Sequence, residues 1–424
     1  MFKKDLVDFI ESGKLDVRLQ MTTCEEDVKG ERKRYIETLD KAVELFGDGD
    51  WHFVSAPGRT EIGGNHTDHQ HGMVIAAAVN LDTLAAVKKN EDNVVRLRSA
   101  GFNIKDIDLS DLSIVEEQKN TTEALIRGIA ARFVELGCKV AGFDGYSVSK
   151  VLVGSGISSS ASFEVLVAQI FNQLFNEGKM DDIEIAKIAQ WAENVHFGKP
   201  CGLLDQMAIS CGGFTMMDFN DPANPIVEKC DFSFKDYGYE LILTNTKGDH
   251  SDLSDEYAAI PNDMKAVAKA MGAQFLRDCS YNNFVENFSA IRRIVNNDRA
   301  MLRAYHLFAE DERVVKQKEA IKSGDVKGLL ELMKESGRSS YMYLQNVSVQ
   351  GRPASQSLAI ALAASERMLK DGAFRVHGGG FEGTIQAVVK EAQVFEYLQA
   401  MQGIFGLDAT FVMKIRPVGG ILVI

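Results

Sequence analysis

Three segments of the chain carry apolar residues at helical spacing. Residues 31–46 ("ERKRYIETLDKAVELF"), residues 122–137 ("TEALIRGIAARFVELG") and the stretch that starts at Phe163 ("FEVLVAQIFNQLFNE") repeat an apolar residue every three or four positions. This period lines one face of an α-helix with apolar side chains and leaves the opposite face polar. We therefore predict a helix in each segment.

Shorter apolar runs between these segments predict strands. They are "WHFVS" at 51–55, "VVRLRS" at 94–99 and "GYSVSKVLV" at 145–153. The longer run "MVIAAAVNLDTLAAVKK" at 73–89 is compatible with one strand or with two. The first half of the chain therefore mixes strands and helices.

The sequence pattern changes near residue 220, where the regular spacing of apolar residues gives way to the turn-rich stretch "DFNDPANP" with its two prolines. Beyond it, strands ("YELILTNT", "GTIQAVVK", "ATFVMKIRP") alternate with longer helices ("ERVVKQKEAIKSG", "SQSLAIALAASERMLKDG"). We predict an α+β chain in two domains, 1–222 and 223–424, with a last strand near 412–424 that returns to the first domain.

Composition narrows the classes of partner. With 424 residues the chain is long enough for two cores, and its net charge of −13 argues against a general nucleic-acid binder. It contains no apolar stretch of about 20 residues, which a membrane span would need. Its six cysteines are far apart and form no CxxC pair, which favours buried thiols in the cytoplasm over a disulfide scaffold.

A crowded polar stretch, "SAPGRTEIGGNHTDHQHG" at 55–72, follows the first predicted strand. Three histidines, an arginine, one glutamate and one aspartate there could bind a metal, a phosphate or a sugar, or could form a solvated loop. The candidate metal ligands are His66, Asp68, His69 and His71. Ligands clustered so tightly in one loop rarely reach tetrahedral geometry without a distant partner, so we do not favour a metal site.

A glycine-serine loop, "LVGSGISSSAS" at 152–162, lies between a predicted strand and a predicted helix. Glycines let backbone N–H groups approach a ligand, and the start of a helix favours an anion. Three consecutive serines at that start favour phosphate binding over an ordinary capped helix, and a hydroxyl there can also bind the Mg²⁺ of a nucleotide. The loop is neither a Walker loop nor a dinucleotide fingerprint, because the required lysine and third glycine are absent.

Two carboxylates follow in "AENVHFGKPCGLLDQMAISCGG" at 192–213. Glu193 and Asp205 are separated by the helix breakers Gly198, Pro200 and Gly202, so they come from different elements. Near a nucleotide, one carboxylate can complete Mg²⁺ coordination while the other binds a substrate hydroxyl. Taken alone, such a pair is also compatible with two surface or capping acids.

Together these stretches resemble the galactokinase branch of the GHMP small-molecule kinases. The family motif A-P-G-R-V-N-L-I-G-E-H-T-D-Y stands here as "APGRTEIGGNHTDH", and P-x-G-A-G-L-S-S-S-A-S as "LVGSGISSSAS". The family motifs G-I-M-D-Q-F and G-G-G-F-G-G stand as "GLLDQM" and "GGGFEG", the latter at 378–383. The order and spacing of the four motifs agree from about residue 50 to the end.

The resemblance implies a two-domain GHMP kinase fold with the active site in the cleft between the domains. It implies transfer of the γ-phosphate of ATP to the anomeric C1 hydroxyl of galactose. Asp205 would face that hydroxyl, either removing its proton or only orienting it, and Arg59 would be its charged neighbour. The implied partners are the sugar and Mg-ATP, without nucleic acid or membrane, in a monomer or weak homo-oligomer.

Further roles implied by the resemblance concern binding. The implied sugar-binding residues are Asn65, His66, Thr67, Asp68, Gly202 and Tyr257. The residues implied for the ATP phosphates are Gly154, Ser155, Gly156, Ile157, Ser158, Ser159 and Ser160. Ser160 and Glu193 would hold Mg²⁺.

Departures from the family motifs leave the sugar open. Asn65 stands where the family has a glutamate at the C6 end of the sugar, His69 replaces a tyrosine, and His71 is an additional imidazole. An amide can donate to a carboxylate that a glutamate would repel, which leaves room for galacturonate, and "HTDHQHG" also resembles plant galacturonate kinases. N-acetylgalactosamine is a further alternative.

Two further departures are Leu152 for a proline and Glu382 for a glycine, and the sequence offers no account of Glu382. A non-catalytic galactose sensor of the same fold is a competing class. In such sensors the serine-alanine pair after the phosphate loop is missing, whereas Ser160 and Ala161 are present here. The sequence therefore favours catalysis.

Overall fold

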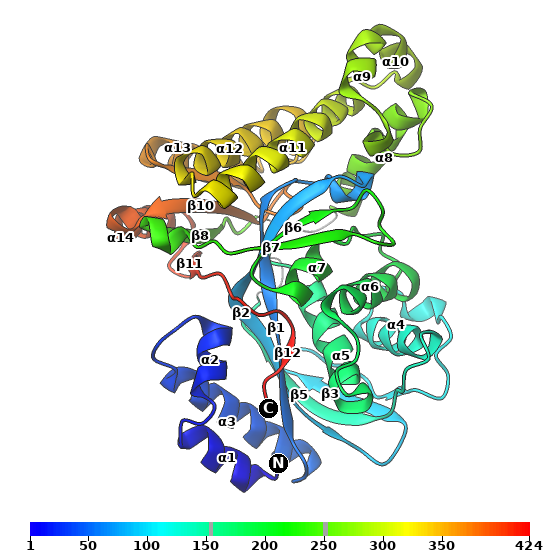
Figure 1. The fold of residues 1–424 in the computed structure, drawn as a ribbon, viewed down its shortest axis with the longest axis vertical. Helices are drawn as coiled ribbons and strands as arrows, with labels where there is room; N and C mark the ends of the chain where they lie inside the picture. The colour runs from blue at the N-terminus through cyan, green and yellow to red at the C-terminus, as the bar shows by residue number, and fades with distance from the viewer. Residues whose placement is uncertain (152–155, 249–252) are drawn as a thin grey trace.

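The computed structural model describes residues 1–151, 156–248 and 253–424. It contains one large sheet and one smaller sheet, each covered by helices (Figure 1). The first sheet has the strand order β12-β1-β2-β5-β3-β4. In addition, β6 pairs with residues 73–77 at the start of β2, and β7 pairs with β6. Its strands are β1 (His52–Gly63), β2 (Met73–Lys89), β3 (Val94–Ser99), β4 (Ile107–Asp108), β5 (Phe143–Ser149), β6 (Phe214–Asp218), β7 (Ile226–Cys230) and β12 (Ile421–Leu422).

The long hairpin of β1 and β2 is the axis of this sheet. The predicted strand at 51–55 continues through the polar motif as far as Gly63, and the run at 73–89 is a single strand. Almost every residue of both strands is buried, as expected for strands covered on both faces. The two strands pair antiparallel with register shifts at Pro57/Gly58 and Glu61/Gly63, so the motif residues lie on a bent strand that then turns.

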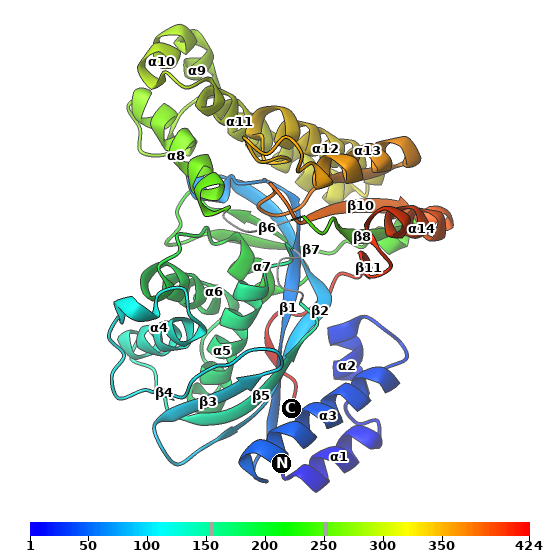
Figure 2. The same cartoon turned by 180° about the vertical axis from the view of Figure 1, so that it is seen from behind.

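Helices cover both faces of the first sheet (Figure 2). One face packs on a core shared with α4 (Thr122–Glu135), α5 (Ser159–Asn176), α6 (Asp182–Ala192) and α7 (Leu204–Cys211). The other face packs on α1 (Lys3–Glu11), α2 (Asp16–Thr23) and α3 (Lys29–Phe46), with Tyr35 and Trp51 among the buried side chains. The predicted helices at 31–46 and 122–137 are confirmed, and the third extends forward to begin at Ser159.

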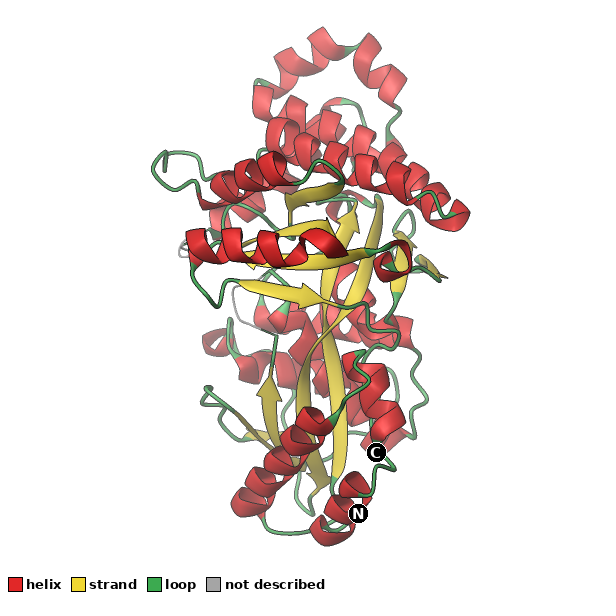
Figure 3. Cartoon of the chain, turned by 90° about the vertical axis from the view of Figure 1, so that its left-hand side faces the viewer, coloured by secondary structure: helices red, strands yellow, loops and turns green. Residues whose placement is uncertain are grey.

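The second sheet has the order β11-β8-β10-β9, and all its pairs are antiparallel. Its strands are β8 (Tyr239–Asn245), β9 (Gly372–Val376), β10 (Thr384–Lys390) and β11 (Thr410–Met413). Helices α11 (Asp298–Ser323), α12 (Val326–Ser339), α13 (Ser357–Met368) and α14 (Val394–Phe405) lie around it (Figure 3). A core that joins β1, β2 and β6 to β8, α11 and α12 connects the two sheets.

A helical projection, α8 (Ser254–Ala270), α9 (Tyr281–Glu286) and α10 (Phe288–Val295), lies at the end of the molecule opposite both termini (Figure 1). The 3₁₀ turns of the chain are η1 (Asp68–Gln70), η2 (Glu116–Gln118), η4 (Phe234–Tyr237), η5 (Leu276–Asp278) and η7 (Glu391–Gln393), and the π-helical turns are η3 (Glu193–Phe197) and η6 (Ser340–Leu344). Among the described residues, no helix combines the length and apolarity needed to cross a bilayer.

The turn-rich stretch near residue 220 joins β6 to β7, which pair with each other in the first sheet. The boundary expected at 222/223 therefore falls inside a hairpin, and the first sheet continues to Cys230. The end of the chain is shared between the sheets, since β11 pairs with β8 and β12 pairs with β1. A turn and a domain boundary have the same composition, and only strand pairing separates them.

Candidate active site

A buried arginine and a half-exposed aspartate form an ion pair between β1 and α7. Arg59 Nε donates to Asp205 Oδ1 at 2.7 Å, and the Arg59 side chain is 6% exposed whereas that of Asp205 is 35% exposed. Ser158 Oγ donates to the other carboxylate oxygen. Burial acts to raise the pKa of Asp205, but the charge of Arg59 and the hydrogen bond from Ser158 outweigh it and lower that pKa below its ordinary value. Residues from three separate motifs thus meet at an ionised carboxylate that faces outward.

The end of the glycine-serine loop holds Arg59 in place. Arg59 Nη1 donates to the carbonyl of Gly156, and the Arg59 backbone N–H donates to the carbonyl of Ile157 at 3.2 Å. Gly156 has φ +74°, and a Cβ there would lie 2.5 Å from Thr384 Oγ1, so the position requires glycine. The loop end therefore approaches both β1 and β10.

Helix α5 begins directly after this loop. Ser158 takes the left-handed conformation at φ 59° as the residue that precedes the helix, and Ser159 and Ser160 form its first turn. Their position puts the unpaired N–H groups of a long helix beside Asp205, which is where an anion is favoured. The predicted phosphate-binding residues Gly154 and Ser155, and the departure at Leu152, lie outside the described residues.

Glu193 lies on a π-helical turn at the end of α6 and is 3% exposed. Its Oε2 accepts from Gln206 Nε2 at 2.9 Å, and its Oε1 accepts from Lys199 Nζ at 3.2 Å. Gln206 Nε2 also donates to Oε2 of the buried Glu164 at 3.0 Å. Gln206 thus ties α7, which carries Asp205, to α5 and to Glu193.

The amide of Asn65 has protein partners at every position. Its Nδ2 donates to Glu61 Oε2 at 3.2 Å and to the carbonyl of Gly378 at 2.8 Å. Its Oδ1 accepts from Ser340 Oγ at 3.1 Å and from Asn346 Nδ2 at 2.9 Å, and the residue is fully buried. The structure leaves the amide no free N–H for a substrate carboxylate, so the geometry does not favour the galacturonate argument made from Asn65.

The three residues after Asn65 differ in how much they are buried. His66 Nε2 lies 3.0 Å from the carbonyl of Gly379, and burial lowers the pKa of this imidazole to about 3. Thr67 is buried, and its hydroxyl donates to the carbonyl of Met73 at 2.7 Å, which ties down the turn. Asp68 is half-buried and packs on Gly202, where a Cβ would lie 1.7 Å from Asp68 Oδ2. His66 and Asp68 therefore retain access that Asn65 and Thr67 lack.

The two additional imidazoles make ring contacts. His69 stacks on His66 with ring centroids 5.8 Å apart, and His71 stacks on Phe275 with centroids 3.7 Å apart. In the described part of the chain, no group of three or more His, Cys, Asp or Glu side chains is arranged to hold a metal ion. The imidazoles of His69 and His71, which are close in the sequence, therefore pack against different residues in the fold.

Backbone carbonyls of the third glycine motif connect these residues. The carbonyl of Gly378 accepts from Asn65, that of Gly379 lies against His66, and that of Gly380 accepts from the Tyr257 hydroxyl at 3.2 Å. A Cβ on Gly379 would lie 2.5 Å from the ring of Tyr257. The motif thus joins the sugar-motif turn to α8, a role that the sequence did not assign to it.

Glu382 is buried rather than exposed at the rim of the site, at 3% exposure. Its Oε2 accepts from Ser357 Oγ at 2.7 Å, and its Oε1 accepts from Ser355 Oγ. A Cβ on Gly248 would lie 1.8 Å from the same carboxylate. The carboxyl group that the sequence left unexplained therefore accepts hydrogen bonds from Ser355 and from Ser357, the first residue of α13.

Sequence reasoning missed three side chains at the site: Glu164, Lys199 and Gln206. Gln206 follows Asp205 in the "GLLDQM" motif, so a partner for a carboxylate could have been sought there. Glu164 occurs one helical turn after Ser160 on α5, and that spacing was the available signal. Lys199 lies in an irregular loop and carries no pattern.

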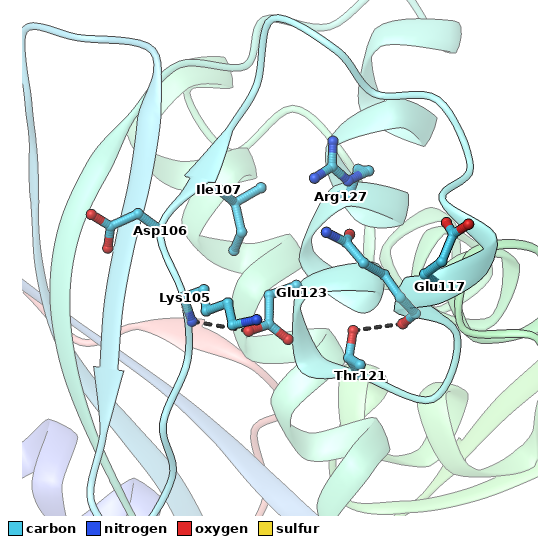
Figure 4. A pocket seen from close by; sticks show the side chains of 8 residues that line it. Lys105, Asp106, Ile107, Glu117, Thr121, Glu123 and Arg127 are labelled. Atoms are coloured by element: carbon cyan, nitrogen blue, oxygen red, sulfur yellow. Dashed lines mark hydrogen bonds between the residues drawn. The ribbon is translucent and has the colours of Figure 1, made fainter.

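A separate small pocket of about 140 Å³ lies beside the start of α4 (Figure 4). Its lining side chains are Lys105, Asp106, Ile107, Glu117, Gln118, Thr121, Glu123 and Arg127. None of the predicted site residues belongs to it. Its charged lining, with Ile107 as its one apolar side chain, does not favour an aromatic ring system.

Comparisons with known proteins agree with this geometry. Residues 43–89 match the galactokinase galactose-binding signature, and residues 124–213 match the GHMP kinase N-terminal domain. The chain is 29% identical to the galactokinase of Clostridium tetani over 87% of this chain and 91% of that protein. It is also 29% identical to the galactokinase of Streptomyces coelicolor over 89% of this chain and 95% of that protein.

Solved structures show the same fold. Lactococcus lactis galactokinase in complex with galactose superposes with a TM-score of 0.79 at 23% identity, over 90% of this chain and 98% of that one. The mevalonate kinase of Methanococcus jannaschii superposes with a TM-score of 0.60 at 17% identity, over 87% of this chain and 99% of that one. Both family matches, the relatives that align over most of the chain and the shared fold thus make this chain similar to the galactokinases and give it the fold of the GHMP kinases.

Proposed function

We propose that this chain is a galactokinase, which transfers the γ-phosphate of ATP to the anomeric hydroxyl of galactose and releases galactose 1-phosphate and ADP. The observation that carries the proposal is the position of Asp205 between Arg59 and Ser158. That contact joins the sugar motif, the phosphate loop and the acidic motif at one carboxylate. It supports a reaction in which a sugar hydroxyl and a phosphate meet.

Asp205 is the residue that binds the reacting hydroxyl. Its lowered pKa keeps it ionised at neutral pH, so it accepts a hydrogen bond from the anomeric O–H and takes the proton as the new P–O bond forms. The leaving ADP keeps the electrons of the broken P–O bond. Arg59 remains paired with Asp205, so it orients the carboxylate and offsets negative charge that develops beside it.

The start of α5 and Glu193 are the groups that hold Mg-ATP. The first-turn N–H groups and Ser158 to Ser160 suit the phosphate oxygens, and Ser160 with Glu193 supplies a hydroxyl and a carboxylate, the hard oxygen donors that Mg²⁺ prefers. One hydroxyl and one carboxylate fit a metal that arrives with the nucleotide, because phosphate oxygens complete its coordination. When bound there, the ion would neutralise charge on the phosphate oxygens.

The sugar end of the site is built from His66, Asp68, Gly202 and Tyr257. We assign hydroxyl binding to His66 and Asp68, and we assign Asn65 and Thr67 to positioning, because their side chains are buried and bonded to protein. The neutral imidazole of His66 and the side-chain oxygens of Asp68 suit the hydroxyls of a neutral hexose. The six unpaired thiols of the described chain support a reducing compartment, so we infer a cytoplasmic enzyme.

The test is a coupled ADP-release assay with galactose, galacturonate, N-acetylgalactosamine, glucose and arabinose as acceptors. We expect galactose to give the highest kcat/KM. Preference for galacturonate would show that another group binds the C6 carboxylate, and absence of turnover with all five sugars would contradict the kinase proposal.

Asp205→Asn is the matched variant for the same assay. It keeps the shape of the side chain but replaces one of the two acceptor oxygens with an N–H donor and removes the charge, so kcat should fall at least about 100-fold. The thermal unfolding midpoint should be retained. Substantial residual turnover would contradict the role given to Asp205.

A further inference from the structure

Lys199 is the cation at this site that the sequence pattern did not reveal. It lies in the loop between η3 and α7, and its side chain is 59% exposed. Its backbone is held firmly, since the N–H groups of Gly198 and Lys199 both donate to the carbonyl of Glu193, at 3.0 and 3.1 Å. The neighbouring Cys201 N–H donates to Asn194 Oδ1 at 2.7 Å. The loop therefore fixes the base of the lysine and leaves its end exposed.

The ammonium of Lys199 reaches the carboxylate that suits the metal of Mg-ATP. Nζ lies 3.2 Å from Glu193 Oε1, and this is the one hydrogen bond that the ammonium makes within the described residues. The other oxygen of Glu193 is held from the interior by Gln206. Lys199 thus approaches Glu193 from the exposed side, where a nucleotide must enter.

The charge of Lys199 also acts on Asp205 and on Tyr257, the residues of the site assigned to the reacting hydroxyl and to the sugar. It contributes to lowering the pKa of Asp205, after the larger effects of burial, Arg59 and Ser158, and it opposes the rise that burial causes in the pKa of Tyr257. Asp205 receives the hydroxyl and Glu193 the metal, so the transferred phosphoryl group passes between them. Lys199 contacts Glu193 and acts electrostatically on Asp205. It therefore lies beside the route of the transferred phosphoryl group.

Most of the Arg59 guanidinium is already engaged by the protein. Its Nε is bonded to Asp205 and its Nη1 to the carbonyl of Gly156, and the side chain is 6% exposed. Phosphoryl transfer needs positive charge on the oxygens of the moving group, and lysine supplies it as a point charge on a flexible stem. The lysine side chain is exposed and has a single hydrogen bond within the described residues, so its ammonium can exchange that bond for one to a phosphate oxygen.

We propose that Lys199 is a further substrate-binding residue, whose ammonium exchanges Glu193 for the γ-phosphate when Mg-ATP binds. This inference rests on the proposed function, because it requires a nucleotide at the start of α5. It assigns the lysine a contact that ATP offers and ADP does not. That difference makes the contact measurable without any sugar.

The experiment compares Lys199→Met with wild type in calorimetric titrations with Mg-AMP-PNP and with Mg-ADP. If Lys199 binds the γ-phosphate, the variant should bind Mg-AMP-PNP about 10-fold more weakly and Mg-ADP equally well, and its kcat should fall by about 10- to 100-fold. Lys199→Arg keeps the charge and should recover part of both losses.

Lys119→Met is the matched control, because that lysine lies against Gly198 but pairs with Glu116, at 2.7 Å. It should change neither affinity. Equal weakening of both nucleotides by Lys199→Met would mean that the lysine only orients Glu193, and unchanged affinities would exclude a phosphate contact; either result overturns the proposal.

Failure of this inference can be told apart from failure of the proposed function. The titrations contain no sugar, so they report on Lys199 even if no tested sugar is phosphorylated. Unfolding midpoints of Lys199→Met and Lys119→Met should match that of wild type, because both side chains are exposed and neither is part of a core.

Discussion

At the scale of single residues, the site is controlled by partners drawn from distant parts of the chain. Asp205 is ionised because Arg59 and Ser158 face it, and Asn65 is removed from the substrate because four protein groups saturate its amide. His66 is neutral because it is buried beneath the third glycine motif. In each case the residue type set the available chemistry, and the neighbours set how it is used.

The half-buried His66 makes a testable contribution to the pH dependence of stability. Its folded pKa of about 3 lies below the ordinary value of 6.5, so as the pH falls the unfolded chain takes up this proton first. The contribution of His66 to stability is therefore complete above about pH 6.5 and is lost as the pH falls toward 3.

His66→Gln removes this titration. From about pH 7.5 to pH 5, the wild type should lose about 1–2 kcal/mol of unfolding free energy relative to the variant. Denaturant unfolding of both proteins at several pH values measures the difference. Parallel pH profiles for the two proteins would show that His66 takes up its proton over the same pH range in the folded and the unfolded chain.

At the scale of elements, loops and turns from distant parts of the chain pack closely because glycines stand at their contacts, as at Gly202 and Gly156. The turn η1, which carries Asp68, and the loop before α7 touch at Gly202, where a Cβ would lie 1.7 Å from Asp68 Oδ2. The loop end at Gly156 approaches β10 in the same way. Glycines in these motifs therefore permit close approach, and they do so between elements that the sequence separates by more than a hundred residues.

Gly202→Ala tests this contact. The added methyl group must displace the Asp68 carboxylate, so the KM for the sugar should rise about 10- to 100-fold. Steady-state kinetics with galactose measures it, and the KM for ATP serves as the internal reference.

Gly403→Ala is the matched control, because no atom lies within 4 Å of the added Cβ in α14. It should leave both KM values unchanged. An unchanged sugar KM in Gly202→Ala would remove Asp68 from the sugar site.

At the scale of the whole molecule, a buried charge cluster joins the amino-terminal helices to the carboxy-terminal segment. Asp82 on β2 is 3% exposed and pairs with Arg34 of α3 at 2.7 Å and with Arg416 at 3.6 Å. Ser55 on β1 donates to the same carboxylate at 2.5 Å. The cluster connects α3, the central hairpin and the segment between β11 and β12 through one side chain.

Asp82→Asn should destabilise the protein by about 3–5 kcal/mol, because it leaves the buried guanidinium of Arg416 without its counter-charge, whereas Arg34 keeps its pair with Glu31 at 3.0 Å. Thermal and denaturant unfolding measure the loss. Asp408, which pairs with Lys247 and is 80% exposed, is the control, since Asp408→Asn should leave the unfolding midpoint nearly unchanged. A small effect of Asp82→Asn would mean that the arginines find other partners.

The sequence by itself determined the α+β class, most helices and strands, the four motifs and the family that they resemble, because periodicity and motif spacing are local properties. It did not determine that Asn65 is saturated, that Glu382 is buried between serines, or that His69 and His71 stack on different rings. Those facts depend on side chains that come together only in the folded chain. The position of Lys199 at the site was also visible only in the folded chain, because the loop between η3 and α7 brings this lysine into contact with Glu193. Only the tertiary structure decided these points, because the burial of a side chain and its hydrogen-bond partners depend on residues that are distant in the sequence. A local sequence pattern does not contain that information.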